Sequence, residues 1–257
     1  MLPSRMECTI AGCQFEPVIG DVEQNITTIR EITESLSEPV EIAVFPELCV
    51  SGYDLEAAVS TATPIPGPIT DQLKRIAAST DVTLVVGLAE QTNEAVYNDL
   101  VSVSPAGTVV KYRKQYLWGA EATTFTADPG PTTIETPVGT VGFLLCYDLN
   151  FPEAALAYAR EQVDVLAVSA AWRASFRHDW DVLLQARALD TTCYVIGTNH
   201  AGDQRGRTHN GGSLIAGPDG TILESVRSGT AVVSAEFDPE FVREARKRNP
   251  VAEMRQK

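Results

Sequence analysis

The sequence alternates short apolar runs with longer segments in which apolar residues return at helical spacing. Residues 42–45 and 141–145 form such runs, which have the length and composition of strands buried on both faces. Between residues 26 and 36, isoleucine and leucine recur near every third or fourth position, which predicts a helix behind a cap at Asp21. A chain built in this way favours an α/β fold.

Turn signals divide the chain into hairpins and crossovers. Pro105-Ala106-Gly107 and Pro218-Asp219-Gly220 predict tight turns between strands. Hairpins need antiparallel neighbours and crossovers need parallel ones, so we expect mixed sheets. No linker or internal repeat interrupts the pattern, and the length suits one domain over residues 1–257. We expect strands at 8–15, 42–45, 83–88, 95–104, 108–112, 132–135, 140–145, 163–169, 193–198, 213–216, 221–225 and 231–237, and later helices over 70–79, 151–161, 179–191 and 239–248.

Composition limits the partners of the chain. It carries 20 Lys and Arg against 34 Asp and Glu, a formal net charge of −14. A surface this acidic repels phosphate backbones and anionic headgroups, so we expect no nucleic acid and no membrane as partners. No apolar stretch of about 18 residues occurs, so no transmembrane helix is expected. Five cysteines without a CxxC pair, and no secretory signal, predict a cytoplasmic protein with reduced thiols.

Cys146 has a position suited to chemistry. It follows the run 141–145 and precedes a predicted helix, so its side chain should face outward at the carboxyl edge of a sheet. N–H groups of the next turn would favour a thiolate and could also bind an oxyanion. From position alone the alternative is a small buried hydrophobic residue, the commoner role of a free cysteine.

Three charged residues could work with such a thiol. Glu47 follows the run 42–45 among apolar neighbours, and partial desolvation would raise its pKa toward the range of a general base. Lys114 closes a strand-like segment beside two other cations, and Glu121 lies in a loop with Trp, Gly and Ala. Taken singly, each of the three could equally be a solvated charge.

Together these residues resemble the carbon–nitrogen hydrolase (nitrilase) superfamily. The separations of 67 residues from Glu47 to Lys114 and of 32 residues from Lys114 to Cys146 fit that family. The resemblance extends over essentially the whole chain. Three segments in order carry it: Phe45-Pro46-Glu47, Arg113-Lys114-Gln115-Tyr116-Leu117 and Cys146-Tyr147-Asp148-Leu149-Asn150-Phe151-Pro152-Glu153.

The resemblance implies both a fold and a mechanism. The fold is a four-layer α-β-β-α sandwich with mixed sheets, paired into a homodimer or a higher homo-oligomer. Cys146 is the implied nucleophile, Glu47 the general base and Lys114 the oxyanion stabiliser, while Glu121 orients the substrate amide. The implied reaction is hydrolysis of a small-molecule amide through a cysteine thioester, with no metal and no other cofactor.

Departures from the family pattern narrow the substrate. Tyr147-Asp148 stand where true nitrilases usually carry Trp-Glu, which favours the amidase branches. We therefore predict an amidase that converts a small carboxamide to the acid and ammonia. Arg173 or Arg177 could bind an acidic substrate group. The residues expected to bind substrate are Tyr53, Trp118, Tyr147 and Trp172, although the two tryptophans could instead serve core or dimer packing.

Other interpretations stay open. N-carbamoyl hydrolysis or an ω-amidase activity would use the same site, and a non-catalytic binding or assembly subunit would keep the fold. A Cys–His–Asp hydrolase would use Cys146 with His200 as its base. We expect instead that His178 caps a helix and that His200 and His209 lie in loops. Only a Cys–His enzyme should tolerate Glu47→Gln.

Overall fold

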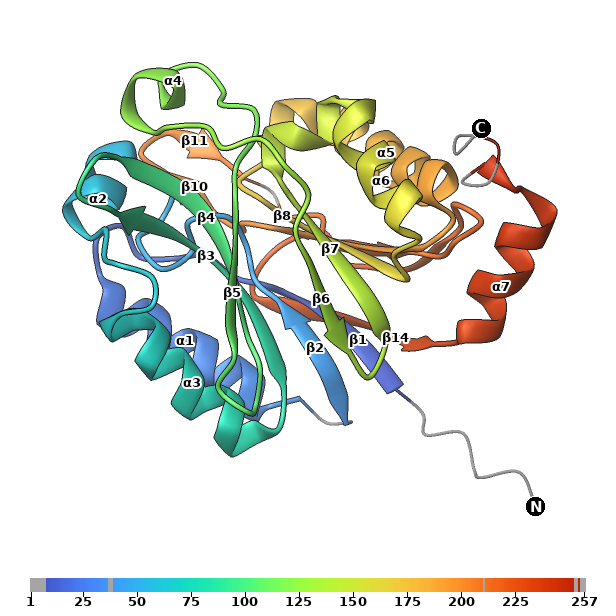
Figure 1. The fold of residues 1–257 in the computed structure, drawn as a ribbon. Coiled ribbons are helices and arrows are strands. Elements are labelled where there is room, and N and C mark those ends of the chain that lie inside the picture. The colour runs from blue at the N-terminus through green and yellow to red at the C-terminus, as the bar shows by residue number, and fades with distance from the viewer. Residues whose placement is uncertain (1–7, 37–38, 210, 252–253, 255–257) are drawn as a thin grey trace.

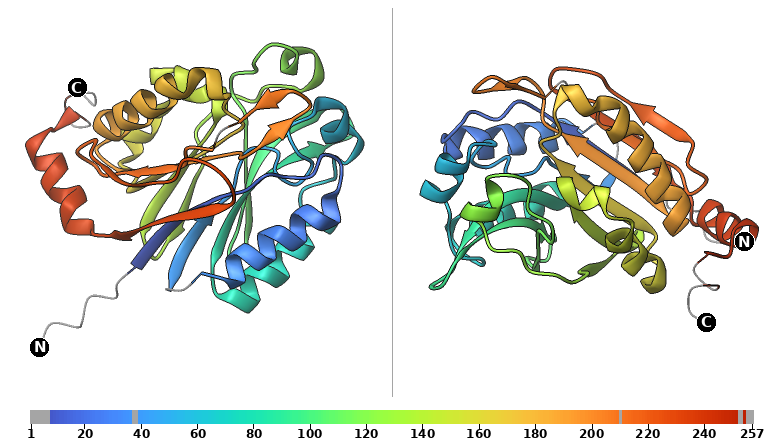
Figure 2. Two further views of the ribbon diagram at one scale, coloured as in Figure 1. Left: turned by 180° about the vertical axis from the view of Figure 1, so that it is seen from behind. Right: turned by 90° about the horizontal axis from the view of Figure 1, so that it is seen from above.

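The structure, a computed structural model, describes residues 8–36, 39–209, 211–251 and 254. Two six-stranded mixed sheets pack face to face, and helices cover the outer face of each sheet (Figures 1 and 2). The four-layer α-β-β-α arrangement expected from the sequence is confirmed.

The first sheet has parallel central strands with antiparallel neighbours on both sides. Helices α1 (Val22–Glu34) and α3 (Pro68–Thr80) cover its outer face, and α2 (Leu55–Ser60) contacts it near one end (Figure 1). As expected, the side chain of Asp21 caps α1 by accepting a hydrogen bond from the next turn. In spatial order the strands are β14 (Ala231–Phe237), β1 (Cys8–Gln14), β2 (Val40–Val44), β3 (Thr83–Gln91), β4 (Val96–Val103) and β5 (Val109–Arg113).

The second sheet repeats this plan. Its three central strands are parallel, and antiparallel pairings join the outer strands. Helices α5 (Pro152–Glu161) and α6 (Arg177–Thr191) cover its outer face (Figure 1). In spatial order its strands are β13 (Ile222–Ser225), β12 (Leu214–Ala216), β9 (Tyr194–Asn199), β8 (Val165–Ala170), β7 (Gly139–Leu145) and β6 (Thr133–Thr136).

The main core lies between the two sheets. Ile10 and Ile42 of the first sheet and Phe143 and Ile196 of the second belong to one buried apolar cluster. A second cluster joins the first sheet to α1 and α3, and a third joins the second sheet to α5 and α6. The central strands of both six-stranded sheets are thus buried on both faces, which explains why these strands have uninterrupted apolar sequences.

Most predicted elements agree with the structure to within two or three residues at each end, and α7 (Pro239–Arg248) agrees at both ends. The prediction that His178 caps a helix was wrong. A short 3₁₀ turn, η2 (Ala174–Phe176), leads into α6, so the helix begins before His178 and places it in the first turn. Several short elements were not predicted: α2, α4 (Glu121–Thr124), β10 (Asp203–Gln204) and β11 (Arg207–Thr208).

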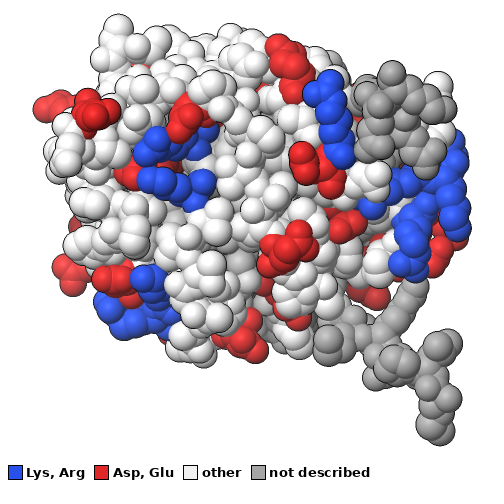
Figure 3. Space-filling model, viewed as in Figure 1, with Lys and Arg blue, Asp and Glu red and all other residues white. Residues whose placement is uncertain are grey.

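On the face that Figure 3 shows, charged side chains lie in scattered groups among uncharged residues, and no extended basic region occurs there. Acidic residues are scattered there, and basic residues form separate small groups, one of them over α7. Arg246, Lys247 and Arg248 occupy the last turn of that helix, where cations interact favourably with the helix dipole. Among the described residues, no helix has the length and apolarity needed to cross a bilayer.

Candidate active site

The predicted catalytic residues come from different strands that end at the same side of the molecule. Glu47 follows β2, Lys114 follows β5 and Cys146 follows β7. Strands β2 and β5 belong to the first sheet and β7 to the second. Because α/β sheets present functional side chains at the carboxyl ends of their parallel strands, this edge is where a site is expected.

Glu47 is fully buried and its carboxylate is held from both sheets. Oε1 accepts hydrogen bonds from Nδ2 of Asn98 at 2.8 Å and from Nζ of Lys114 at 2.6 Å. Oε2 accepts a bond from the backbone N–H of Ala171, at the end of β8, at 3.0 Å. The carboxylate therefore has one fixed orientation.

The loop that carries Glu47 lies directly against β3. A Cβ atom on Gly87 would lie 2.4 Å from the carbonyl oxygen of Pro46 and 2.7 Å from Cα of Glu47, so only glycine fits there. On the other side, Oγ of Ser169 donates a 2.6 Å hydrogen bond to the carbonyl of Phe45. The second sheet thus holds both the backbone and the carboxylate of this loop.

Lys114 bridges two buried carboxylates. Its Nζ lies 2.6 Å from Oε1 of Glu47 and 2.8 Å from Oε2 of Glu121, and all three side chains are at most 1% exposed. Burial alone would lower the pKa of Lys114, but the two carboxylates more than offset this and raise its pKa well above the usual range. Lys114 is therefore an ammonium ion. The alternative that Lys114 is a solvated charge is wrong, because its side chain is buried.

Glu121 is fixed by three groups. Its Oε1 accepts a 2.8 Å hydrogen bond from the hydroxyl of Tyr53, and its Oε2 accepts one of 2.8 Å from the backbone N–H of Trp118. The third partner is Lys114. Glu121 begins the short helix α4, so a single turn presents this carboxylate to the lysine.

Cys146 occupies a strained turn between β7 and η1 (Cys146–Asn150). Its φ of +45° is a left-handed conformation that non-glycine residues rarely adopt and that recurs at functional sites. Burial and the negative charges of Glu47 and Glu121 raise the pKa of its thiol well above the usual range, against the opposing effects of Lys114 and the Ala171 N–H. The thiol is thus neutral at physiological pH and needs a base to react.

Asp148 ties the cysteine turn to the lysine segment. Its Oδ1 accepts a 2.8 Å bond from the N–H of Tyr116, and its Oδ2 accepts bonds from the hydroxyl of Tyr112 at 2.7 Å and from the N–H of Leu145 at 3.0 Å. Burial raises the pKa of Asp148 to about 6, even though Lys114 and these donors oppose the shift. Asp148 therefore fixes Leu145, which precedes Cys146, and the two tyrosines on either side of Lys114.

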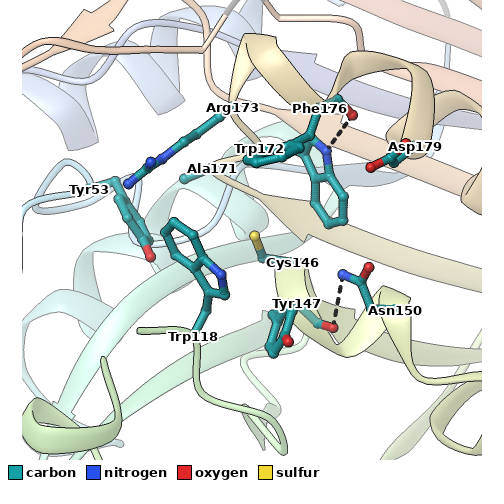
Figure 4. Close-up of a pocket in the computed structure, with 10 residues that line it drawn as sticks. All are labelled: Tyr53, Trp118, Cys146, Tyr147, Asn150, Ala171, Trp172, Arg173, Phe176 and Asp179. Atoms are coloured by element: carbon teal, nitrogen blue, oxygen red, sulfur yellow. Dashed lines mark hydrogen bonds between the residues drawn. The ribbon is translucent and has the colours of Figure 1, made fainter. Parts of the chain in front are cut away.

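A pocket of about 190 Å³ opens onto Cys146 (Figure 4). The sulfur of Cys146 points into the space between Trp118, Tyr147 and Trp172 in this view. All four residues predicted to bind substrate line the pocket, together with Cys146 and five further residues. The lining consists of Tyr53, Trp118, Cys146, Tyr147, Asn150, Ala171, Trp172, Arg173, Phe176 and Asp179.

The histidines do not line this pocket. His200 is fully buried and its Nε2 contacts the backbone carbonyl of Glu47 rather than a catalytic side chain. Burial and the neighbouring His209 lower the pKa of His200 to about 3, so it is uncharged. Both residues lie in loops, as expected. This geometry favours Glu47 over His200 as the base.

Sequence reasoning missed Asn98, the Ala171 N–H and the positioning roles of Asp148 and His200. Asn98 lies within a strand with no local mark of function, and it meets Glu47 only through the sheet pairing. A backbone donor such as Ala171 leaves no signal in residue types. Asp148 alone had a signal, because it lies inside the cysteine segment that carried the resemblance.

The arrangement places a nucleophile, Cys146, in the lining of the pocket, and a buried carboxylate and ammonium group close enough to the thiol to shift its pKa. The described residues contain no group of three His, Cys, Asp or Glu side chains placed to hold a metal ion. A carboxylate that can take a proton beside a thiol, with an ammonium ion close by, suits attack on a carbonyl carbon and stabilisation of the resulting oxyanion.

Comparisons with known proteins agree with this geometry. The sequence matches the carbon–nitrogen hydrolase family over residues 9–247. It is 31% identical to the deaminated glutathione amidase of Escherichia coli O157:H7, over 94% of this chain and 95% of that protein. It is 30% identical to the 2-oxoglutaramate amidase of Bacillus subtilis (strain 168), over 96% of each. The fold is similar to the solved structure of a CN-hydrolase superfamily protein from Xanthomonas campestris, with a TM-score of 0.89 and 23% identity over 96% of this chain and 97% of that one.

Proposed function

The chain belongs to the carbon–nitrogen hydrolase family, and from this premise we propose that it is an amidase with a Glu–Lys–Cys site. It converts a small carboxamide to the carboxylic acid and ammonia through a thioester on Cys146. The observation that carries the proposal is the buried Glu47–Lys114–Glu121 network beside a thiol that faces a pocket. An ion-pair network that served only to stabilise the fold would not need to lie next to a pocket.

The first half of the reaction forms the thioester. Sγ of Cys146 attacks the amide carbon while its proton passes to Glu47, because a thiol with a raised pKa is a poor nucleophile until a base removes the proton. Lys114 and the backbone N–H of Tyr147 stabilise the oxyanion, and losing one such donor costs about 2.7–4 kcal/mol. The carbon–nitrogen bond then breaks as Glu47 returns the proton to the leaving ammonia.

The second half releases the acid. Glu47 accepts a proton from water as the water oxygen attacks the thioester carbon, and the same oxyanion donors stabilise the second tetrahedral intermediate. The carbon–sulfur bond breaks, and the thiolate of Cys146 recovers its proton from Glu47. Glu121 keeps Lys114 in position and orients the substrate amide. Tyr53, Trp118, Tyr147 and Trp172 form the walls that hold the acyl group.

The two relatives described above favour an amide substrate. Both relatives described above are named for amidase activity, and the name 2-oxoglutaramate amidase denotes the ω-amidase type. An ω-amidase is therefore the second candidate. N-carbamoyl hydrolysis would differ in releasing carbon dioxide together with ammonia.

Ammonia release from a panel of amides, nitriles and carbamoyl compounds tests the proposal. We expect turnover of amides only, none by Cys146→Ala, and an acyl adduct on Cys146 by mass spectrometry of the wild type during turnover. A folded protein that turns over no amide and forms no adduct would instead be a non-catalytic binding or assembly subunit.

We also propose that the protein works in the cytoplasm as a homodimer, with residues 1–257 as one domain. All five cysteines are free thiols, which suits a reducing compartment. Val182 and Leu189 of α6 and Ile222 and Leu223 of β13 expose 40–47% of their surface, and apolar side chains of this kind suit an interface between copies. Light scattering during size-exclusion chromatography tests the dimer, which an elution as monomer would exclude.

A further inference from the structure

Residues 171–173 leave the end of strand β8 and form part of the pocket wall (Figure 4). The ladder between β8 and β9 ends at Asn199, so the backbone groups of this segment need other partners. The N–H of Ala171 donates to Oε2 of Glu47 at 3.0 Å. The segment therefore contacts the proposed base and also shapes the pocket that Cys146 lines.

The side chain of Asn199 supplies the missing partners. Its Oδ1 accepts a 2.6 Å hydrogen bond from the N–H of Trp172, and its Nδ2 donates a 3.1 Å bond to the carbonyl of Trp172. Nδ2 also donates to the carbonyl of Gly211 at 2.7 Å, and Oδ1 accepts a second bond from the N–H of His200 at 2.9 Å. All four hydrogen-bonding positions of the amide are thus used. Asn199 is 2% exposed, so these bonds form away from water.

These contacts determine where the Ala171 N–H points. The peptide that carries it also carries the last C=O of β8, which accepts a 3.2 Å bond from the N–H of His200. Asn199 holds that same N–H of His200 and, through Trp172, the next peptide along the chain. Since a hydrogen bond weakens steeply when its angle closes, a small rotation of this segment would remove the Ala171 donor from the carboxylate of the base.

We propose that Asn199 is a positioning residue for the hydrolysis, whose amide aims the Ala171 N–H at Glu47 and holds Trp172 in the pocket wall. The inference rests on the proposed amidase function and adds a residue to it. Asn199 does not line the pocket, so it acts only through the segment that it holds. Without the Ala171 donor, the carboxylate could rotate away from the geometry in which it accepts a proton from Cys146.

Asn199→Asp tests the proposal with the smallest change of shape. It puts an oxygen in place of Nδ2, against the carbonyls of Trp172 and Gly211. At about pH 8 we expect kcat/KM for butyramide to fall by about ten- to a hundredfold, mainly through kcat, because misplacing a catalytic group has effects of this size. Toward about pH 6 the new carboxyl group can take a proton and donate again, so activity relative to the wild type should recover in part.

Asn25→Asp is a matched control. Asn25 is 1% exposed, its Oδ1 accepts a bond from the N–H of Val18, and its Nδ2 donates to the carbonyls of Val18 and Val50. The exchange therefore removes the same kind of donor from two carbonyls and should lower the melting temperature by a similar amount. We expect Asn25→Asp to keep kcat/KM within about threefold of the wild type throughout this pH range.

A second variant and a second readout separate positioning from stability. Asn199→Ser removes the bonds to Trp172 without adding a charge, so it should lose kcat with no recovery toward low pH. Alkylation of Cys146 by iodoacetamide, followed by mass spectrometry, needs no turnover. Burial raises the pKa of the Cys146 thiol and the Ala171 N–H opposes that shift. Both Asn199 variants should therefore be alkylated at least about threefold more slowly than Asn25→Asp at about pH 8.5.

Two results would overturn the role of Asn199. One is an equal loss of activity in Asn199→Asp and Asn25→Asp at similar melting temperatures, because the loss would then follow stability alone. The other is alkylation of Cys146 in the Asn199 variants as fast as in the control. If the folded wild type turns over no amide, the amidase function itself is refuted, and the alkylation rates still decide whether Asn199 positions the Ala171 N–H.

Discussion

Replacing Glu47 with glutamine tests the proposed mechanism most directly, because it removes the proposed base and keeps the shape of the side chain. The carboxylate accepts bonds from Asn98 and Lys114 on one oxygen and from the Ala171 N–H on the other. A glutamine can place its oxygen on only one of these sides. If the oxygen keeps Asn98 and Lys114, the amide NH₂ faces the Ala171 N–H, and two donors meet.

The size of the effect follows from these contacts. Loss of a general base costs about 10²–10⁴ in rate, which is about 2.7–5.4 kcal/mol at 1.36 kcal/mol per tenfold. The buried donor left without an acceptor costs a further ~1–3 kcal/mol of folding stability. We therefore expect kcat/KM to fall at least about a hundredfold in a protein that remains folded at room temperature.

The assay is ammonia release at saturating and limiting amide, with thermal unfolding measured on the same samples. Glu153→Gln is a suitable control, since Glu153 is an exposed acid in the first turn of α5 near the cysteine turn. It should keep kcat/KM within about twofold of the wild type. Should Glu47→Gln retain more than about a tenth of the activity, glutamate is not the base. A large loss in His200→Gln alongside such retention would support the Cys–His alternative.

Three further predictions follow from the charges of the site. Because burial, Glu47 and Glu121 raise the pKa of Cys146, its alkylation by iodoacetamide should keep accelerating up to about pH 9 without a plateau. Asp148→Asn should remove the acid limb near pH 6 from the kcat/KM profile, because protonation of a carboxylate with pKa of about 6 displaces one of its N–H donors. Lys114→Met should lower the unfolding free energy by about 3–5 kcal/mol in urea titrations, since it leaves two buried carboxylates without a cation.

Each of these has a contrary result. A thiolate absorbance that titrates near neutral pH would show that Cys146 is already ionised. An unchanged acid limb in Asp148→Asn would assign that limb to another group. For the lysine, the double variant Lys114→Met/Glu121→Gln should recover part of the lost stability, because it removes one of the two stranded charges. A double variant less stable than the single one would contradict the electrostatic explanation.

The sequence allowed the family, the layers and most strands to be predicted, and the resemblance inferred there is confirmed. Local sequence patterns predicted the buried strands correctly where a run of apolar residues marks them, as in residues 42–45 before Glu47. They could not establish that Lys114 is buried while its neighbours Lys111 and Arg113 pair with Glu90 near the surface, because the three cations look alike along the chain. Short elements such as α2 and α4 were missed because they hold too few residues to show a period.

Contacts made across long chain separations were beyond prediction from spacing. Asn98 and Ala171 reach Glu47 from 51 and 124 residues away, and neither residue type marks a catalytic role. The wrong helix cap at His178 has a local cause, since a preceding 3₁₀ turn moved the start of α6. For the partners of Glu47, the deciding information lies in how strands of the two sheets come together.

The loop of Glu47 belongs to one half of the sandwich, yet Ser169, Ala171 and His200 of the other half secure it. Neither half of the sandwich contains by itself all the residues that make up the proposed active site. During refolding, catalysis should consequently return only after the halves have docked, later than circular dichroism reports the helices. Turnover thus reports whether the two halves have docked. A mutation that weakens the packing between the two sheets should abolish activity at temperatures below that of global unfolding.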